Sequence, residues 1–323
     1  MKPLSFSSGN LLADRRADYA EMLLSAGDHK AAAELMGEAL ALAPDWAAGH
    51  FRHGEMLAEA GETAAAVEAW RIVLRLDPAD RLGAALKLEF HGAAAGLNAA
   101  PSAFVETLFD QYADHFDEAL VEKLAYRVPE LLLGALQKLG REEFAHAVDL
   151  GCGTGLMGER LRAGASFLEG IDISGEMLKR AEAKRIYDRL SRRDLLTLDS
   201  LQEGVDLVVA ADVFMYMGAL ERIFAVVAAA LAPGGVFAFS VEQHDGPGDM
   251  VLRPSRRYAH SPFHLRSLLE AAGFNIASFE SAVIRMDRGE PVEGLIVVAV
   301  RKEAAADDVA MLEEAAAERT ELQ

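Results

Sequence analysis

A glycine-rich stretch from Val148 to Gly158 constrains the fold of this chain more than any other feature. An apolar run, Phe144 to Leu150, predicts a buried strand that carries one acid, Asp149, near its end. Glycines follow at alternate positions, and a helical pattern begins at Leu156. Glycine permits a turn too tight for side chains, and the helix after it presents unpaired N–H groups to that turn. The stretch therefore predicts a strand, a turn and a helix that admit a flat, elongated cofactor.

The spacing of these glycines distinguishes two classes of site. A dinucleotide-binding fingerprint requires G-x-G-x-x-G. Counted from Gly151, the sixth residue is Leu156, so the last glycine of that fingerprint is missing. The sequence has G-x-G-x-G after Asp-Leu instead, which disfavours a nicotinamide-dependent oxidoreductase.

The segment Asp149-Leu-Gly-Cys-Gly-Thr-Gly155 resembles motif I of the class I S-adenosylmethionine (SAM)-dependent methyltransferases. The resemblance extends over about residues 102–301. It implies a Rossmann-like α/β fold with a seven-stranded sheet, and SAM as the cofactor. The cofactor-binding residues that it implies in this turn are Asp149, Gly151, Gly153 and Gly155.

A second predicted strand, Phe167 to Ile173, carries Asp172 at its end. A carboxylate at this position can accept hydrogen bonds from both ribose hydroxyls. A helix from Gly175 to Lys184 follows. The resemblance implies that Ile173 and Met177 sandwich the adenine, whereas ordinary strand-to-helix packing is the alternative for Met177.

A third strand is predicted within Tyr187 to Leu195, although its arginines are poor strand formers. The resemblance implies that Asp194 meets the adenine amino group and that the backbone N–H of Leu195 also contacts the base. Asp188 and Asp199 are competing candidates for the acidic role.

The fourth predicted strand begins at Val205 and ends in Asp212, at the carboxyl edge where open α/β sheets bind ligands. The resemblance implies that Asp212 meets the methionine portion of SAM and that Tyr216 lines the acceptor side. A Leu-x-Pro-Gly-Gly turn after the next helix is another feature of the family. Two closing strands are predicted at Phe274–Ile284 and Gly294–Arg301.

The stretch from Gln243 to Ser261 is predicted to be a substrate-facing loop because of its length and its His, Arg and Tyr content. Methyl transfer to an alcohol or amine benefits from a base that titrates near neutrality. His260 is the first candidate, with Tyr216 next; a capping hydrogen bond within its own turn is the alternative for His260. His260 and His264 are one helical turn apart, but no other residue completes a metal site, so none is expected. The acceptor-binding residues are predicted to be His244, Arg257 and Tyr258.

A helix is predicted over Pro101 to Tyr126, with aromatic residues at spacings of three and four. It is similar to the helix that folds over the SAM site in many small-molecule methyltransferases. That similarity implies that Tyr112 touches the cofactor, whereas core packing is an equal alternative for Phe109 and Phe116.

An internal repeat of 34 residues occupies about residues 13–80. Gly27 and Gly61 share this spacing, as do Pro44 and Pro78, and each unit has the pattern of two amphipathic helices. This pattern is typical of tetratricopeptide repeats (TPR), which bind peptides or proteins; an alanine-rich helical bundle is the alternative. The predicted domains are a TPR-like helical domain (residues 1–100), a methyltransferase domain (101–303) and an acidic helical tail (304–323).

The formal charge of −19 disfavours a nucleic-acid partner, because phosphate backbones are bound mainly through Lys and Arg. The only cysteine, Cys152, excludes an internal disulfide. No signal peptide or membrane span is expected, so we predict a cytoplasmic protein without a membrane partner.

The leading hypothesis is a SAM-dependent methyltransferase that acts on an O or N atom of a small-molecule acceptor. The second is a protein or peptide methyltransferase recruited through the repeats, which could also mediate self-association. The third is a non-catalytic nucleotide-binding scaffold, against which the complete set Asp149, Asp172 and Asp212 argues.

Overall fold

The computed structural model describes residues 7–94, 96–118, 120 and 124–303, and the predicted tail at 304–323 lies outside them. The chain divides into two compact units. The helical unit comprises Met1–Phe109 with two later segments, Tyr216–Gly218 and Leu252–Tyr258. The α/β unit comprises Asp110–Met215, Ala219–Val251 and Ala259–Gln323.

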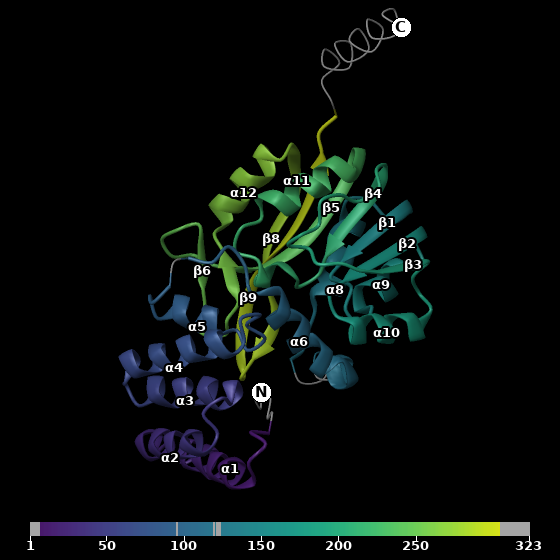
Figure 1. Ribbon diagram of the computed structural model, residues 1–323. Coiled ribbons are helices and arrows are strands. Elements are labelled where there is room, and N and C mark those ends of the chain that lie inside the picture. The colour runs from purple at the N-terminus through teal and green to yellow at the C-terminus, as the bar shows by residue number, and fades with distance from the viewer. Residues whose placement is uncertain (1–6, 95, 119, 121–123, 304–323) are drawn as a thin grey trace, which may run out of the picture. The chain divides into compact units, whose positions relative to one another are not determined.

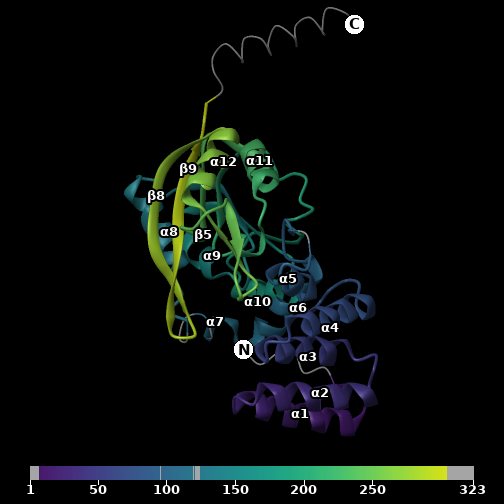
Figure 2. The same ribbon diagram turned by 90° about the vertical axis from the view of Figure 1, so that its left-hand side faces the viewer.

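The helical unit is built from helix pairs (Figure 2). Helix α1 packs on α2, α2 on α3, and α3 on α4, with α5 against α4. Gly27 and Gly61, which follow α1 and α3, have the same φ of +83°, a conformation that favours glycine. The repeat spacing therefore corresponds to equivalent turns in the two helix pairs. The helices are α1 (Leu11–Ser25), α2 (His29–Leu42), α3 (Ala47–Glu59), α4 (Thr63–Leu76) and α5 (Ala84–Phe90).

The second helix pair packs around Trp70, which is fully buried. Its indole Nε1 donates to the carbonyl oxygen of Phe51 at 3.3 Å. A Cβ at Gly54 would lie 2.4 Å from the same Nε1, so only glycine allows α3 to approach α4 this closely. The small residue of one helix thus accommodates the large residue of the next.

The α/β unit contains a mixed sheet whose strand order begins β3-β2-β1-β4-β5, with parallel pairing throughout these five (Figure 1). The long β8–β9 hairpin follows, with β9 antiparallel to β5 (Figure 2). The strands are β1 (Phe144–Leu150), β2 (Ala165–Asp172), β3 (Arg189–Arg192), β4 (Val205–Ala210), β5 (Leu231–Gln243), β8 (Phe274–Asp287) and β9 (Glu290–Arg301). This arrangement is a Rossmann-like parallel sheet extended by an antiparallel hairpin, as the resemblance implies.

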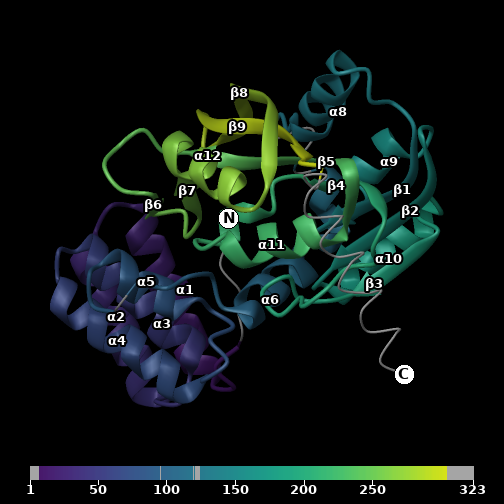
Figure 3. The same cartoon turned by 90° about the horizontal axis from the view of Figure 1, so that it is seen from above.

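Helices cover both faces of the sheet (Figure 3). Helix α8 packs on β5, β8 and β9 and also on α9, whereas α11 and α12 pack on β5 and β8 from the other face. The central strands are apolar runs buried on both sides, as strands in parallel sheets are. The helices are α8 (Val128–Lys138), α9 (Leu156–Leu161), α10 (Gly175–Lys184), α11 (Glu221–Ala230) and α12 (Pro262–Ala271).

The stretch predicted to be a substrate-facing loop contains two short strands, β6 (Met250–Leu252) and β7 (Tyr258–His260). All three residues of β7 are buried, and its end pairs in parallel with Glu242 and Gln243 of β5. The described residues therefore form a sheet of nine strands rather than seven. The loop prediction was wrong here because tertiary pairing with β5 is not visible in local composition.

The single helix predicted over 101–126 is also interrupted. Helix α6 (Ser102–Tyr112) is followed by a 3-10 turn, Ala113–His115, and a short helix α7, Phe116–Glu118. Among the described residues, no helix has both the length and the apolar character needed to cross a membrane.

Candidate cofactor-binding site

The turn between β1 and α9 is a cradle of glycines with positive φ. The φ values are +65° at Gly151, +54° at Gly153 and +96° at Gly155, a region that L side chains rarely adopt. A Cβ at Gly151 would also lie 2.4 Å from Cγ2 of Val213. At Gly153 the nearest atom would be Cε1 of Phe116 at 3.7 Å, so this glycine is needed for its conformation and not for space.

Asp172 ends β2 and faces this turn. One carboxylate oxygen accepts from the backbone N–H of Gly153 at 2.8 Å, and the other accepts from the N–H of Ser174 at 2.8 Å. Burial raises the pKa of Asp172 to about 6, although these backbone hydrogen bonds oppose the rise. Each carboxylate oxygen has a further lone pair, so the group can still accept from two hydroxyls.

Asp149 lies at the end of β1 and is fully buried. Its Oδ2 accepts from the hydroxyl of Tyr187 at 2.6 Å, whereas its Oδ1 is buried and has no hydrogen-bond partner among the described residues. Burial raises the pKa of Asp149 to about 7; the Tyr187 hydrogen bond lowers it and the charge of Asp172 raises it further. An unsatisfied buried acceptor is costly, and a ligand that supplies a donor removes that cost.

The segment from Asp110 to Glu118 is bonded to the glycine turn and to α10. Asp110 accepts from the hydroxyl of Ser174 at 2.5 Å, and Asp117 accepts from the hydroxyl of Thr154 in the turn. Asp117 also pairs with Lys184 of α10 at 2.8 Å. Tyr112 lies half-buried within this segment.

The remaining predicted adenine contacts follow β2 and β3. Met177 is fully buried at the start of α10, where its N–H donates to the hydroxyl of Ser174, and Ile173 is half-buried. Asp194 and Leu195 are half-buried, and Asp194 accepts from the N–H of Leu196 at 2.9 Å.

A buried ionic cluster occupies the carboxyl edge of β4 and β5. Asp212 has a φ of +59°, an uncommon conformation for a residue with a side chain. Arg285 of β8 donates to both oxygens of Asp212, at 2.6 and 2.7 Å, and also to Glu242 of β5. Arg285 is 1% exposed and Glu242 2%. The sequence analysis named Asp212 but neither Arg285, which binds it, nor Glu242, the second carboxylate bound by Arg285. The only local signal of these two residues is a charged residue within a strand.

His260 does not lie in a loop. It is fully buried at the end of β7, and its carbonyl oxygen accepts from the N–H of His244 at 2.9 Å. The ring Nε2 of His244 lies 3.1 Å from the carbonyl oxygen of Pro247 in its own turn. Both histidines thus lie beside the carboxyl end of β5, with which β7 pairs.

Tyr258, a predicted acceptor-binding residue, is bonded within the helical unit. Its hydroxyl donates to Glu89 at 2.9 Å and to the carbonyl oxygen of Leu97 at 3.2 Å. The neighbouring Arg257 accepts through its carbonyl oxygen from the N–H of Arg253. Both residues follow a turn whose Arg256 lies over the ring of Phe104, 4.6 Å from its centroid. The chain therefore uses this stretch, at least in part, to complete the helical unit.

Tyr216 also belongs to the helical unit. It is buried, its ring meets that of Phe109 edge-on at 5.6 Å, and its carbonyl oxygen accepts from the N–H of Ala100. No group of three or more His, Cys, Asp or Glu residues that could share a metal ion occurs in the described part of the chain.

Part of the α/β unit is similar to known proteins. Residues 148–237 match a family described as a methyltransferase domain. The chain is 40% identical over 86 residues to human methyltransferase-like protein 27, a match that covers 26% of this chain and 35% of that protein. It is 33% identical over 136 residues to the malonyl-[acyl-carrier protein] O-methyltransferase of Geobacter sulfurreducens, covering 40% of this chain and 49% of that protein. The matches thus span about a third and a half of these relatives.

A solved structure shares the fold. The 1,6-didemethyltoxoflavin-N1-methyltransferase of Burkholderia thailandensis, with its acceptor and S-adenosylhomocysteine bound, has a TM-score of 0.50 and 19% identity over 65% of this chain and 94% of that one. At this identity the likeness concerns the fold alone. The α/β unit has the class I methyltransferase fold, and its residues 148–237 match a methyltransferase domain. The glycine cradle and the Oδ1 of Asp149, which has no hydrogen-bond partner among the described residues, fit SAM as a ligand.

Proposed function

We propose that the protein transfers a methyl group from SAM to an O or N atom of a small-molecule acceptor. The observation that carries the proposal is the convergence of Asp149, Asp172 and the glycine cradle at the carboxyl ends of β1 and β2. Two buried acids at a turn without side chains suit a ligand that is polar, elongated and rich in hydrogen-bond donors.

The proposed roles of the binding residues follow from their contacts. Asp172 accepts from the ribose hydroxyls, and Asp149 offers its Oδ1 to a donor on the amino-acid end. Tyr112 covers the site, Ile173 and Met177 hold the adenine, and Asp212 lies toward the methionine portion. Asp194 and the backbone N–H of Leu195 bind the edge of the base. SAM supplies an electrophilic methyl group on a sulfonium, and in-line attack requires a fixed acceptor and the exclusion of water.

We assign the general base to His260, which would take the acceptor's proton at a ring nitrogen. Its burial beside the end of β5 supports the assignment, because proton transfer from the acceptor requires a site from which water is excluded. Tyr216 remains the alternative, with His244, Arg257 and Tyr258 in proposed acceptor-binding roles. By their names, the Geobacter sulfurreducens relative is an O-methyltransferase and the Burkholderia thailandensis enzyme of the same fold is an N-methyltransferase. The proposal therefore includes both acceptor atoms.

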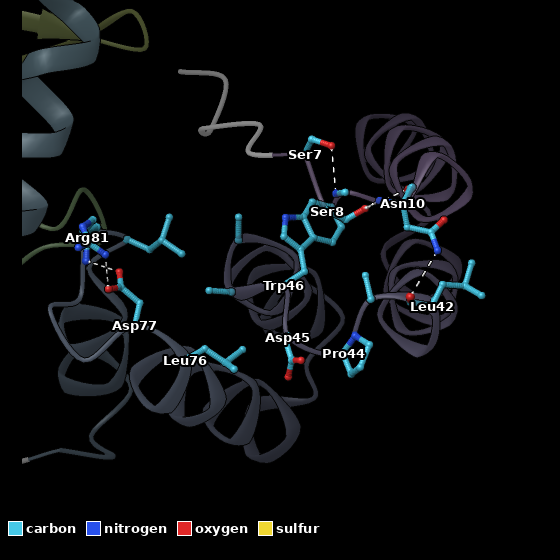
Figure 4. A pocket seen from close by; sticks show the side chains of 15 residues that line it. Ser7, Ser8, Asn10, Leu42, Pro44, Asp45, Trp46, Leu76, Asp77 and Arg81 are labelled. Atoms are coloured by element: carbon cyan, nitrogen blue, oxygen red, sulfur yellow. Dashed lines mark hydrogen bonds and ion pairs between the residues drawn. The ribbon is translucent and has the colours of Figure 1, made fainter.

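A second candidate function, methylation of a peptide or protein, is favoured by a cavity of about 670 Å³ in the helical unit. The indole of Trp46 projects into it, and Leu76 and Arg81 line it (Figure 4). We propose that the helix pairs are tetratricopeptide-type repeats, that residues 1–100 and 101–303 are separate domains, and that this cavity would hold a peptide segment.

The two candidates are distinguished with SAM that carries a radioactive methyl group. The protein is incubated with the low-molecular-weight fraction and, separately, with the protein fraction of a cell extract. Label in a small molecule that depends on His260 supports the first candidate, and label in protein that is lost in Trp46→Ala supports the second. If no label is transferred from SAM to a small molecule or to a protein in either fraction, both candidate functions are contradicted.

A further inference from the structure

Three glycines on three different elements provide space for one tyrosine ring. A Cβ at Gly158 of α9 would lie 2.3 Å from the hydroxyl oxygen of Tyr187. A Cβ at Gly170 of β2 would lie 3.0 Å from Cε1 of that ring, and one at Gly155 would lie 3.2 Å from Cε2. The glycines of the motif region therefore do more than admit a ligand, since they also admit this side chain behind the turn.

The backbone around Tyr187 is fixed on both sides. The N–H of Asp188 donates to the carbonyl oxygen of Leu168, and the Asp188 carboxylate accepts from the N–H of Leu168 at 2.8 Å. Arg162 donates to the carbonyl oxygen of Ile186 at 2.9 Å and pairs with Asp188 at 2.7 Å. The ring thus has little freedom to leave Asp149.

The two oxygens of the Asp149 carboxylate therefore have different surroundings. The Tyr187 hydroxyl donates to Oδ2 of Asp149 at 2.6 Å, and no group in the described part of the chain bonds the buried Oδ1. We infer that Tyr187 is a positioning residue of the cofactor site, holding Asp149 so that Oδ1 receives the cationic amino group of the bound cofactor. This inference rests on the proposed function, because it needs the SAM site. Neither the family motif nor the spacing of the glycines points to Tyr187.

SAM affinity is expected to depend on pH through the ionisation of Asp149. The groups that face Asp149 are Tyr187, Asp172, Cys152 and Tyr126. Burial keeps the pKa values of Cys152 and of both tyrosines well above their ordinary values, so these three are neutral near pH 7. Asp172, with a pKa of about 6, is the other charge. Loss of the Tyr187 hydrogen bond removes an influence that lowers the pKa of Asp149, so its ionised form would require a higher pH.

The test is calorimetric titration of SAM into wild type, Tyr187→Phe and Gly158→Ala between pH 6 and 9. Gly158→Ala keeps the tyrosine but displaces its hydroxyl, and its helical backbone accepts alanine. For both variants we expect SAM affinity to fall at least about tenfold at pH 7, the scale of a hydrogen bond to a charged group. The loss should shrink toward pH 9, because Asp149 is ionised there in every variant.

Two matched controls and one further variant separate the outcomes. Tyr19→Phe removes an exposed hydroxyl, and Gly134→Ala adds a methyl to helix α8 where no atom lies within 4 Å, so both should bind as wild type. In an Asp149→Asn background, Tyr187→Phe should have no further effect on affinity. Unchanged affinity in both Tyr187→Phe and Gly158→Ala, or a loss independent of pH, overturns the inference and leaves the SAM site intact. Failure of wild type to bind SAM overturns the proposed function and the inference together.

Discussion

Two edges of the sheet are built differently: the carboxyl ends of β1 and β2, the proposed cofactor edge, and those of β4 and β5, the proposed acceptor edge. At β1 and β2, two acids are held mainly by backbone N–H groups and by one tyrosine, and one oxygen stays unsatisfied. At β4 and β5, Asp212 and Glu242 are bound to Arg285 in a closed ionic cluster. At the first edge a buried acceptor oxygen is left for a ligand, whereas at the second both carboxylates are already paired with Arg285. We infer that the proposed acceptor edge is a rigid wall and the proposed cofactor edge a receptor.

Arg285→Met should have the largest effect on stability. It leaves two buried carboxylates without their cation, and breaking a buried pair costs about 3–5 kcal/mol. Urea denaturation monitored by circular dichroism measures the change. Lys138→Met, which removes an exposed pair with Glu280, is the control and should change stability by less than about 1 kcal/mol. Equal effects of the two substitutions would contradict the claim that Arg285 makes this edge of the sheet rigid.

His260→Ala should lower turnover by about 100-fold or more if this residue is the base. SAM affinity, measured by titration, should stay within about threefold of wild type, because the proposed contact is with the acceptor. His264→Ala, whose ring lies near Asp249, is the control. A parallel loss of SAM affinity and turnover would assign His260 to the cofactor edge instead.

Asp172→Ala should weaken SAM binding by about 1.5–3 kcal/mol, the scale of hydrogen bonds to a charged group. Thermal denaturation checks that the variant is folded. Asp18→Ala is the matched control, since that residue is exposed on helix α1 and has no proposed role in binding. Unchanged affinity in a folded Asp172→Ala protein would remove the ribose assignment.

The two acids of the cofactor edge should also make the free energy of unfolding depend on pH. One carboxyl group changes it by at most about 1.4 kcal/mol per pH unit. Asp149 and Asp172 have raised pKa values of about 7 and about 6, so the folded protein binds more protons than the unfolded chain between about pH 4 and pH 7. Their contribution therefore reduces stability as pH rises through this window. Asp149→Asn should lose less stability than wild type between pH 4 and pH 7, and parallel curves would contradict the pKa of about 7.

Much of this contrast could be predicted from the sequence. The cofactor edge was predictable because its residues lie in one short stretch, Asp149 to Gly155, with Asp172 one crossover later. The ionic cluster was not, since Arg285 is 73 residues from Asp212 and reaches it only through the hairpin that pairs with β5. Tyr187 was missed for the same reason, because three separate elements must meet before its pocket exists.

For the stretch 243–261 the sequence analysis did not miss a feature but predicted a wrong one. Its composition suits a loop, yet pairing with β5 makes part of it a strand. Its other part, from Leu252 to Tyr258, completes the helical unit, where the Tyr258 hydroxyl meets Glu89. Local patterns do not encode partners that lie about 170 residues away.

Parallel calorimetric titration of wild type with SAM, S-adenosylhomocysteine and NAD tests the central claim most directly. A receptor built from Asp149, Asp172 and the glycine cradle should bind both adenosyl ligands at micromolar concentrations and should not bind NAD. Binding of NAD alone, or of none of the three, would contradict the assignment of this edge as a SAM site.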